Sequence, residues 1–464
     1  MSVAAILAAV SALAGPTGTW SGSYSLPRGT EPAAISVELR GGTAIVALGP
    51  GHAASTRVTT RAAAGRLRFL LPGRPAPVAF DGTLRRGVLA GTVRQGTIRG
   101  AFRLRRGAPI AGRELGLYAL ADGRHMVVWD GFDVRLIADL GGGEIHGLAR
   151  RRAGSYAIGA GLTDLRPAGS ARLDGSSLSW APTGGAAVAG PRIPFRQEEV
   201  RVASAPGALA CTLTLPATGG RLPAVAIVHG SGIAPRRIVG LYSGFFADAG
   251  MAVLACDKRG NGQSSGPYPG ERATTAAIDR YARDGEAAAR FLAAQPEVDP
   301  QRVGLSGGSQ AGWIMPLAAS REPAIRWLLL LVPPTITVDE NDTYADLTTQ
   351  GASIPPLSPA EIDAAVRKAG PGGFDPLPAI RALAIPALWV FGALDQHVDT
   401  RLSVERLDPV AHEPGRDFSY VVLPGGAHSL LATEHGLNDE VGRSHQMAPG
   451  LFTVMRDWLR AHGF

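Results

Sequence analysis

The fold of the second half of the chain is decided by the stretch Val303-Gly304-Leu305-Ser306-Gly307-Gly308-Ser309-Gln310-Ala311-Gly312-Trp313. An apolar run ends in two glycines and a serine, and small residues then open a helical pattern. We interpret it as a strand, a tight turn carrying Ser309, and a helix. Such a turn exposes the serine hydroxyl only where the residues two before and two after it are small, as Gly307 and Ala311 are. A Gly/Ser-rich turn without chemistry has similar composition, so the surrounding sequence is the test.

A serine hydroxyl needs a base, an orienting acid and donors for a developing oxyanion before it can act as a nucleophile. Three further apolar, strand-like runs lead into polar segments that could supply them. The run 224–228 leads into His229-Gly230-Ser231-Gly232, the run 387–391 into Gly392-Ala393-Leu394-Asp395, and the run 420–423 into the segment ending in Ala427-His428-Ser429. Each polar segment follows the carboxyl end of a predicted strand, which is the edge of an open parallel sheet where ligands bind.

Residues 197–464 resemble the α/β-hydrolase fold, and are most similar to bacterial serine esterases related to the prolyl-oligopeptidase and dienelactone hydrolase groups. The resemblance lies in HGSG at 229–232, DKRGNGQSSG at 257–266, GGSQAG at 307–312, GALD at 392–395 and GGAH at 425–428. The chain order Ser, Asp, His is that of the α/β hydrolases. One departure is Ala311, where the common turn has glycine, and we expect its small side chain to be tolerated.

The resemblance and the placement at strand ends together suggest a role for each residue. Ser309 would attack an acyl carbonyl, His428 would take and return its proton, and Asp395 would orient the imidazole. The backbone N–H groups of Gln310 and Ser231 would hold the oxyanion.

Five more residues are expected to support the site. His229, Gly230 and Gly232 would shape the oxyanion loop, while Asp257 and Arg259 would brace the turn after their strand by charge-assisted hydrogen bonds. Two of these roles have alternative candidates. Asp399 could replace Asp395 as the acid. The base could be His397, His412 or His435 in place of His428.

These assignments predict hydrolysis of a carboxylic ester or related acyl bond of a small molecule through an acyl-enzyme, with no cofactor and no metal. A serine peptidase is the nearest alternative, because the same three residues cleave amides. Prolyl-oligopeptidase relatives carry a large propeller, for which about 180 residues of β structure are too few. A non-catalytic binding protein with this fold is the alternative from a different class. Nothing in the sequence indicates the natural substrate or the oligomeric state.

A length of 464 residues predicts two or three domains. Residues 15–110 show short alternating segments separated by Gly and Pro, which predict an all-β barrel or sandwich. Residues 111–182 continue in this style, so one β domain or two are both compatible with the pattern. A Pro/Gly-rich stretch, 183–196, reads as a linker.

Residues 197–464 are predicted to form a doubly wound, mostly parallel α/β sheet, because later strands alternate with helical patterns. Residues 333–378 are too long for a plain crossover and predict a small cap that includes a helix at 359–369. In the β part, Asp122, His125, Asp130, Asp133, His146 and Asp164 lack the spacing of metal ligands and are explained by turns and surface positions.

The formal charge is +7, but 44 of the 46 basic residues are arginine, since the only lysines are Lys258 and Lys368. The arginines are scattered, so we do not predict nucleic-acid binding. Residues 1–14 are small and apolar and end in an A-x-A pattern, which predicts a signal peptide and a secreted or periplasmic protein. The segment has no basic residue, and a mis-assigned start or a short buried helix would instead indicate the cytoplasm. No other run predicts stable membrane insertion. Cys211 and Cys256 lie in apolar runs and are expected to be buried free thiols.

Overall fold

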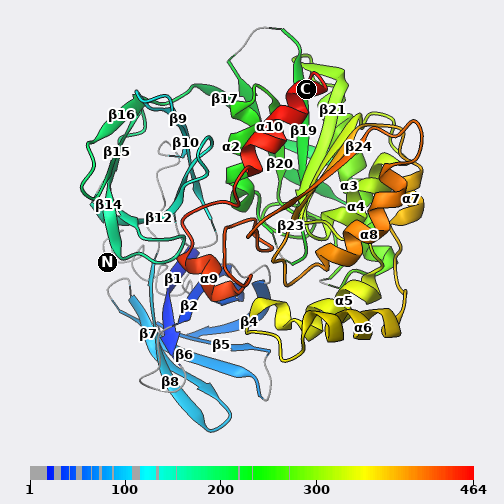
Figure 1. The fold of residues 1–464 in the computed structure, drawn as a ribbon. Helices are drawn as coiled ribbons and strands as arrows, with labels where there is room; N and C mark the ends of the chain where they lie inside the picture. Colours follow the sequence, from blue (N-terminus) through cyan, green and yellow to red (C-terminus); the bar gives the residue numbers. More distant parts are fainter. Residues whose placement is uncertain are drawn as a thin grey trace. The chain divides into compact units, whose positions relative to one another are not determined.

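The computed structural model describes residues 18–464, except for 26–32, 41, 49–54, 64, 73–75, 86–87, 107–114, 132–134, 153, 218–219, 233 and 271. The predicted signal peptide, 1–14, therefore lies outside the described residues. The chain divides into two compact units, Met1–Gly112 and Arg113–Phe464, and each is described by itself (Figure 1). None of the helices in the described part has the length and apolar character needed to span a bilayer.

The first unit contains a closed antiparallel barrel. Its core is built by alternation: in β5 every second side chain faces inward, so Leu67, Phe69 and Leu71 are buried between exposed neighbours. Phe69 stacks on Phe80 with ring centroids 4.7 Å apart. The sequence is compatible with either a barrel or a sandwich. The first strand pairs with the eighth, so the sheet is a closed barrel. The strands are β1 (Gly18–Ser25), β2 (Ala33–Arg40), β3 (Thr43–Leu48), β4 (Ser55–Ala63), β5 (Arg66–Leu71), β6 (Val78–Arg85), β7 (Val88–Gln95) and β8 (Ile98–Arg106).

The second unit begins with a separate antiparallel sheet that nearly closes on itself. Its edges meet through hydrogen bonds from Ala121 N to Ala189 O (3.0 Å) and from Ile193 N to Leu117 O (2.8 Å). The β region is therefore two structures rather than one. The strands, in order across the sheet, are β9 (Gly116–Ala119), β10 (His125–Asp130), β11 (Arg135–Asp139), β12 (Ile145–Arg152), β13 (Ser155–Gly159), β14 (Pro167–Leu173), β15 (Ser177–Pro182) and β16 (Val188–Pro191).

The stretch 183–196 differs from the linker that its composition predicts. It contains β16 and the first residues of β17 (Phe195–Ala203), and Ile193 is bonded to β9. Its Pro and Gly residues are thus found at a sheet edge and in the turns beside it, where they are also tolerated.

The rest of the second unit is a doubly wound sheet with the order β17-β18-β20-β19-β21-β22-β23-β24. The pairs β17–β18 and β18–β20 are antiparallel, and all other pairs are parallel. This arrangement confirms the predicted mostly parallel α/β-hydrolase sheet. The strands after β17 are β18 (Ala208–Pro216), β19 (Leu222–Val228), β20 (Ala252–Cys256), β21 (Val298–Gly308), β22 (Trp327–Leu331), β23 (Ala387–Gly392) and β24 (Phe418–Leu423).

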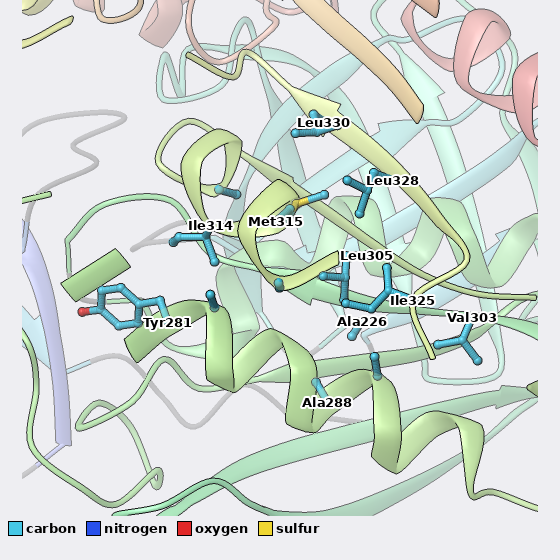
Figure 2. Close-up of a cluster of buried hydrophobic side chains, with 14 of the residues drawn as sticks. Ala226, Tyr281, Ala288, Val303, Leu305, Ile314, Met315, Ile325, Leu328 and Leu330 are labelled. Carbon is cyan, nitrogen blue, oxygen red and sulfur yellow. The ribbon is translucent and has the colours of Figure 1, made fainter. Parts of the chain in front are cut away.

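Helices cover both faces of this sheet. One face packs against α3 (Thr275–Ala293), α4 (Ala311–Ala319) and α8 (Thr400–Ala411), and Figure 2 shows Leu305, Leu328 and Leu330 of the strands beside Ile314 and Met315 of α4. The other face packs against α2 (Gly240–Asp248) and α10 (Leu451–Ala461). Apolar strands buried on both faces are typical of parallel sheets.

The second β sheet packs on the helix layer that contains α2. A Cβ atom at Gly244 in α2 would lie 2.4 Å from Cγ2 of Val127 in β10, so glycine is needed for this close approach. Side chains of β10 and α2 share one buried cluster with the hydrolase sheet. The second β sheet and the α/β sheet therefore share part of their core.

The predicted cap lies between β22 and β23 and is helical. It consists of α5 (Val338–Leu347), η3 (Thr349–Gly351) and α6 (Pro359–Ala369). Thr337 begins α5 and Ser358 begins α6, each in a capping box with Glu340 or Glu361, and this reciprocal bonding defines where the two helices start. In the described residues, three shorter helices lie outside the cap, and they are η2 (Arg236–Val239), α7 (Leu377–Arg381) and α9 (Asn438–Arg443).

The prediction that Cys211 and Cys256 are free thiols is wrong. They face each other on the antiparallel pair β18–β20 and form a disulfide across 45 residues of sequence. Each does lie in a buried strand, as expected. The pairing could not be anticipated, because strand register is not written in either segment alone.

We expect reduction of this disulfide to lower the free energy of unfolding by about 4 kcal/mol, because a cross-link over this span restricts the unfolded chain. Urea unfolding with and without reductant measures the difference. As a check on the bond itself, protein unfolded in urea without reductant should not react with iodoacetamide. Two alkylated cysteines under those conditions would contradict the disulfide.

Candidate active site

Ser309 lies in a strained turn between β21 and α4. Its φ is 57°, a left-handed conformation that is uncommon for serine and that clusters at functional sites. Two backbone hydrogen bonds fix it there, from Ser309 N to Leu331 O (3.0 Å) and from Gly312 N to Ser309 O (2.7 Å). A Cβ atom at Gly307 would lie 2.3 Å from Val228 O and 2.9 Å from Cβ of Ala311. The strand and helix therefore approach as closely as the small residues around Ser309 predict.

Ser309, Asp395 and His428 follow the carboxyl ends of β21, β23 and β24, which run parallel in one sheet. His428 Nδ1 lies 2.8 Å from Asp395 Oδ2. The other oxygen of Asp395 accepts hydrogen bonds from His397 N (2.7 Å) and Val398 N (2.9 Å). The carboxylate is fully buried, whereas 16% of the His428 side chain is exposed. A carboxylate held at Nδ1 fixes the orientation and the tautomer of the His428 imidazole.

The structure gives Asp399 a different task. Its Oδ1 accepts a hydrogen bond from Leu402 N (2.9 Å), so Asp399 is the N-cap of α8. Burial raises the pKa of the Asp399 carboxyl. Of the two acidic residues in this loop, Asp395 is the one in contact with His428.

The alternative histidines also have their own positions. The His397 ring stacks on the His428 ring with centroids 4.5 Å apart. His412 ends α8 and contacts Asp408, and His435 pairs with Glu440 (2.8 Å). His397 thus packs against His428, while the other two histidines lie in separate contacts.

The HGSG loop reaches Ser309 through its first glycine. A Cβ atom at Gly230 would lie 3.1 Å from Gly308 O and 3.3 Å from Cβ of Ser309. Ser231 follows in an exposed bend, and Gly232 has a φ of 77°. On the other side of Ser309, Gln310 is the N-cap of α4, where backbone N–H groups lack intrahelical partners. Both segments therefore lie beside Ser309, and each carries backbone N–H groups.

His229 anchors the start of this loop. Its Nε2 donates a hydrogen bond to Cys256 O (2.6 Å), and the ring is buried. Burial lowers the pKa of His229 from 6.5 to about 4. The neutral imidazole is the form that the fold accommodates.

This pKa predicts a loss of stability in acid. The unfolded chain binds a proton at this histidine near pH 6.5 and the folded chain only near pH 4, so folding stability falls as the pH falls through this window. At pH 4 the loss from this group is about 3 kcal/mol. Urea unfolding of the parent and of His229→Gln between pH 7 and 4 measures it. The variant should be less stable at pH 7 but lose less stability on acidification, and equal losses would contradict the assignment.

Asp257 and Arg259 both brace this region, but with separate partners. Asp257 accepts hydrogen bonds from Arg236 N (2.8 Å) and Gln263 N (2.7 Å) and pairs with the Arg236 guanidinium. Arg259 is fully buried and pairs with Asp284, its Nε lying 3.0 Å from Oδ2. Removing one partner of such a buried pair is strongly destabilising, so both residues hold the loop after β20 in place.

The cap contacts the site through the Asp395 loop. Tyr344 of α5 donates its hydroxyl to Asp395 O (2.7 Å), and Thr348 donates to Gln396 O (2.5 Å). A pocket of about 710 Å³ lies between this loop, α6 and α8, and it is lined mainly by apolar side chains such as Ile362 and Val404. Asp395 borders this pocket, whereas Ser309 and His428 do not line it.

The six residues of the β part that were considered as metal ligands do not form one cluster, and the five that the structure describes contact different partners. Asp122 pairs with Arg124 and Asp164 with Arg166, Asp130 contacts Arg135, His125 contacts Asp248, His146 contacts Glu144, and Asp133 lies outside the described residues. Elsewhere in the described chain, Glu434, His435 and Glu440 place ligand atoms within 4.8 Å of one another. The Glu440 carboxylate there already accepts from His435 N and Leu437 N, as a helix cap does.

Three residues near the site were missed by the sequence analysis. They are Lys258, Tyr281 and Tyr344. Only Lys258 carried a signal, because lysine is rare in a chain that otherwise uses arginine. The other two are placed by tertiary packing alone.

Comparison with known proteins places these residues in context. Residues 221–357 match the family model described as serine aminopeptidase, S33. Two uncharacterized proteins of Mycobacterium tuberculosis, from strains CDC 1551 / Oshkosh and H37Rv, are 30% identical over 213 residues. That match spans 46% of this chain and 65% of the length of each relative.

The solved structures that match this chain are more distant in sequence. An esterase of Pyrococcus furiosus is 16% identical, with 57% of this chain and 91% of that chain covered and a TM-score of 0.41. A puromycin-hydrolysing peptidase of Mycobacterium tuberculosis is 18% identical, with 97% and 80% covered and a TM-score of 0.43. The family match supports a hydrolase, in agreement with the α/β-hydrolase sheet and with the resemblance found in the sequence.

Proposed function

We propose that this protein is a serine hydrolase that cleaves a carboxylic ester or a related acyl bond of a small molecule, with Ser309, His428 and Asp395 as a catalytic triad. The single observation that carries the proposal is the contact of 2.8 Å between His428 Nδ1 and the buried carboxylate of Asp395, at the same sheet edge as the strained turn of Ser309. No cofactor is required for this chemistry.

The reaction would proceed in two halves. Ser309 Oγ attacks the acyl carbonyl while His428 Nε2 takes its proton, and the oxyanion is held by the N–H groups of Gln310 and Ser231. The leaving alcohol departs with the proton from His428, which leaves an acyl-serine. Water then attacks the acyl carbon with His428 again as base, and Ser309 and the acid product are released. The burial of Asp395 supports its role, because it keeps the carboxylate oriented while the imidazolium forms.

Cleavage of an amide bond is the second candidate, favoured by the family description of residues 221–357 as a serine aminopeptidase. The same acyl-enzyme would form, with an amine as the leaving group. Esters and peptides differ in how much they demand from the general acid, because an amine leaves only when protonated.

The test combines covalent labelling with a substrate panel. A fluorophosphonate should label Ser309 in the folded protein, and p-nitrophenyl esters of graded acyl length should be hydrolysed faster than aminoacyl p-nitroanilides. Faster anilide cleavage would favour the peptidase. A folded protein that is not labelled would overturn both enzymatic readings and favour a non-catalytic binding protein.

We also propose secretion or export to the periplasm. The A-x-A pattern at the end of residues 1–14 and the disulfide between Cys211 and Cys256 support it, because disulfides persist mainly in oxidising compartments. N-terminal sequencing of the protein from a bacterial periplasmic fraction tests the proposal. A cytoplasmic protein that retains residues 1–14 would contradict it.

A further inference from the structure

Lys258 occupies a buried position directly after β20, beside both segments that flank the nucleophile. Only 6% of the residue is exposed to solvent. Nζ donates hydrogen bonds to Gly230 O (2.6 Å) and to Gln310 Oε1 (3.1 Å). The same nitrogen lies 4.3 Å from the centroid of the Tyr281 ring. A single side chain thus joins the HGSG loop to the residue that follows Ser309.

The contact with Gly230 has a direct consequence for Ser231. The carbonyl of Gly230 and the N–H of Ser231 belong to one planar peptide group, and in a trans peptide these two bonds point in opposite directions. Holding the carbonyl toward Lys258 therefore directs the Ser231 N–H to the opposite side. A cation at the carbonyl oxygen also polarises the peptide group and strengthens its N–H as a donor.

The contact with Gln310 acts on the other oxyanion donor. Gln310 supplies its backbone N–H to the proposed oxyanion hole, and its side chain is tied to Lys258. Lys258 N also donates to Ala234 O (2.9 Å), at the far end of the HGSG loop. The loop and the start of α4 are consequently held to one common residue.

The surroundings of Nζ suit an ammonium group. Two oxygen acceptors and an aromatic face are the partners that such a group binds. The compact point charge of lysine differs from the planar fork of arginine, which needs more space and a different acceptor geometry. This is one of two lysines among 46 basic residues, and the other, Lys368, is exposed near the end of α6.

We propose that Lys258 is a positioning residue for the oxyanion hole: it orients the Gly230–Ser231 peptide and Gln310, and its charge strengthens the field at the developing oxyanion. This inference rests on the proposed serine hydrolase function. It assigns to Lys258 an effect on the transition state rather than on substrate binding.

The test compares Lys258→Met with Lys368→Met. Each variant replaces one lysine by methionine, an uncharged side chain of similar length. We expect Lys258→Met to lower kcat for p-nitrophenyl acetate by about 10- to 100-fold, less than or comparable to the loss of one oxyanion donor. KM should change by less than about twofold, since ground-state contacts are unaffected. The inhibition constant of an alkyl boronic acid, which mimics the tetrahedral state, should rise by the same factor as kcat/KM falls. Lys368→Met should match the parent in all three measurements.

The outcomes separate this inference from the function on which it rests. An inactive parent would overturn the proposed function itself. An active parent with Lys258→Met equal to Lys368→Met would overturn the role of Lys258 alone, as would a raised KM with unchanged kcat. Thermal unfolding establishes whether Lys258→Met folds. If it does not, Gln310→Met, which removes one of the two acceptors and keeps the backbone N–H, decides the question: a fall in kcat at constant KM supports the inference, and an unchanged kcat overturns it.

Discussion

Replacing Ser309 by alanine is expected to reduce kcat for a p-nitrophenyl ester by about 10⁴- to 10⁶-fold, the size of effect seen when the nucleophile of a triad is removed. The reason is that no acyl-enzyme can form without Oγ, so only binding and the oxyanion donors would remain to accelerate hydrolysis by water. The measurement is the initial rate of p-nitrophenol release under saturating substrate, together with fluorophosphonate labelling, which should disappear.

The matched control is Ser320→Ala. Ser320 is exposed and ends the same helix that begins after Ser309, where its hydroxyl donates to Leu317 O (2.9 Å). It should retain the activity of the parent. Alanine accepts the left-handed conformation no more easily than serine does, so thermal unfolding of Ser309→Ala should stay close to that of the parent. Comparable activity in Ser309→Ala and the parent would contradict the proposed nucleophile.

The turn at Ser309 could be predicted because its constraints are local. The need for small residues around a serine with positive φ appears directly as Gly307 and Ala311 in the sequence, and the structure places Val228 O and the Ala311 side chain against Gly307. The doubly wound sheet could be predicted for a similar reason, since buried parallel strands read as continuous apolar runs.

Features that depend on pairing between distant segments could not be predicted. The disulfide requires Cys211 and Cys256 to face each other across β18 and β20, and their register is decided by strands that are 45 residues apart. Closure of the barrel depends in the same way on the pairing of β1 with β8. The stretch 183–196 looked like a linker because Pro and Gly are frequent in linkers and at sheet edges alike.

The choice between the two acids of the 392–399 loop also needed the tertiary structure. Both follow β23 within a few residues, and the sequence could offer only a preference for the one nearer the strand. The direction of each side chain depends on the turn between them, in which Asp395 turns back to accept from His397 N and Val398 N. Asp399 then falls at the first turn of α8, a position where aspartate is favoured for capping.

Asp395→Asn should therefore abolish most of the activity, whereas Asp399→Asn should leave it nearly unchanged. In Asp395→Asn the amide oxygen would keep the bonds from His397 N and Val398 N, which leaves the NH₂ group facing His428 Nδ1. A donor at that position stabilises the imidazole tautomer with its proton on Nε2, which cannot accept the proton of Ser309, and we expect kcat to fall by about 10⁴-fold. In Asp399→Asn the asparagine can still cap α8, so kcat should stay within about twofold and the free energy of unfolding within about 1 kcal/mol of the parent. Steady-state kinetics and urea unfolding of the two variants measure both quantities. Loss of activity in Asp399→Asn with retention in Asp395→Asn would reassign the acid, because only the carboxylate that orients the base is indispensable to proton transfer.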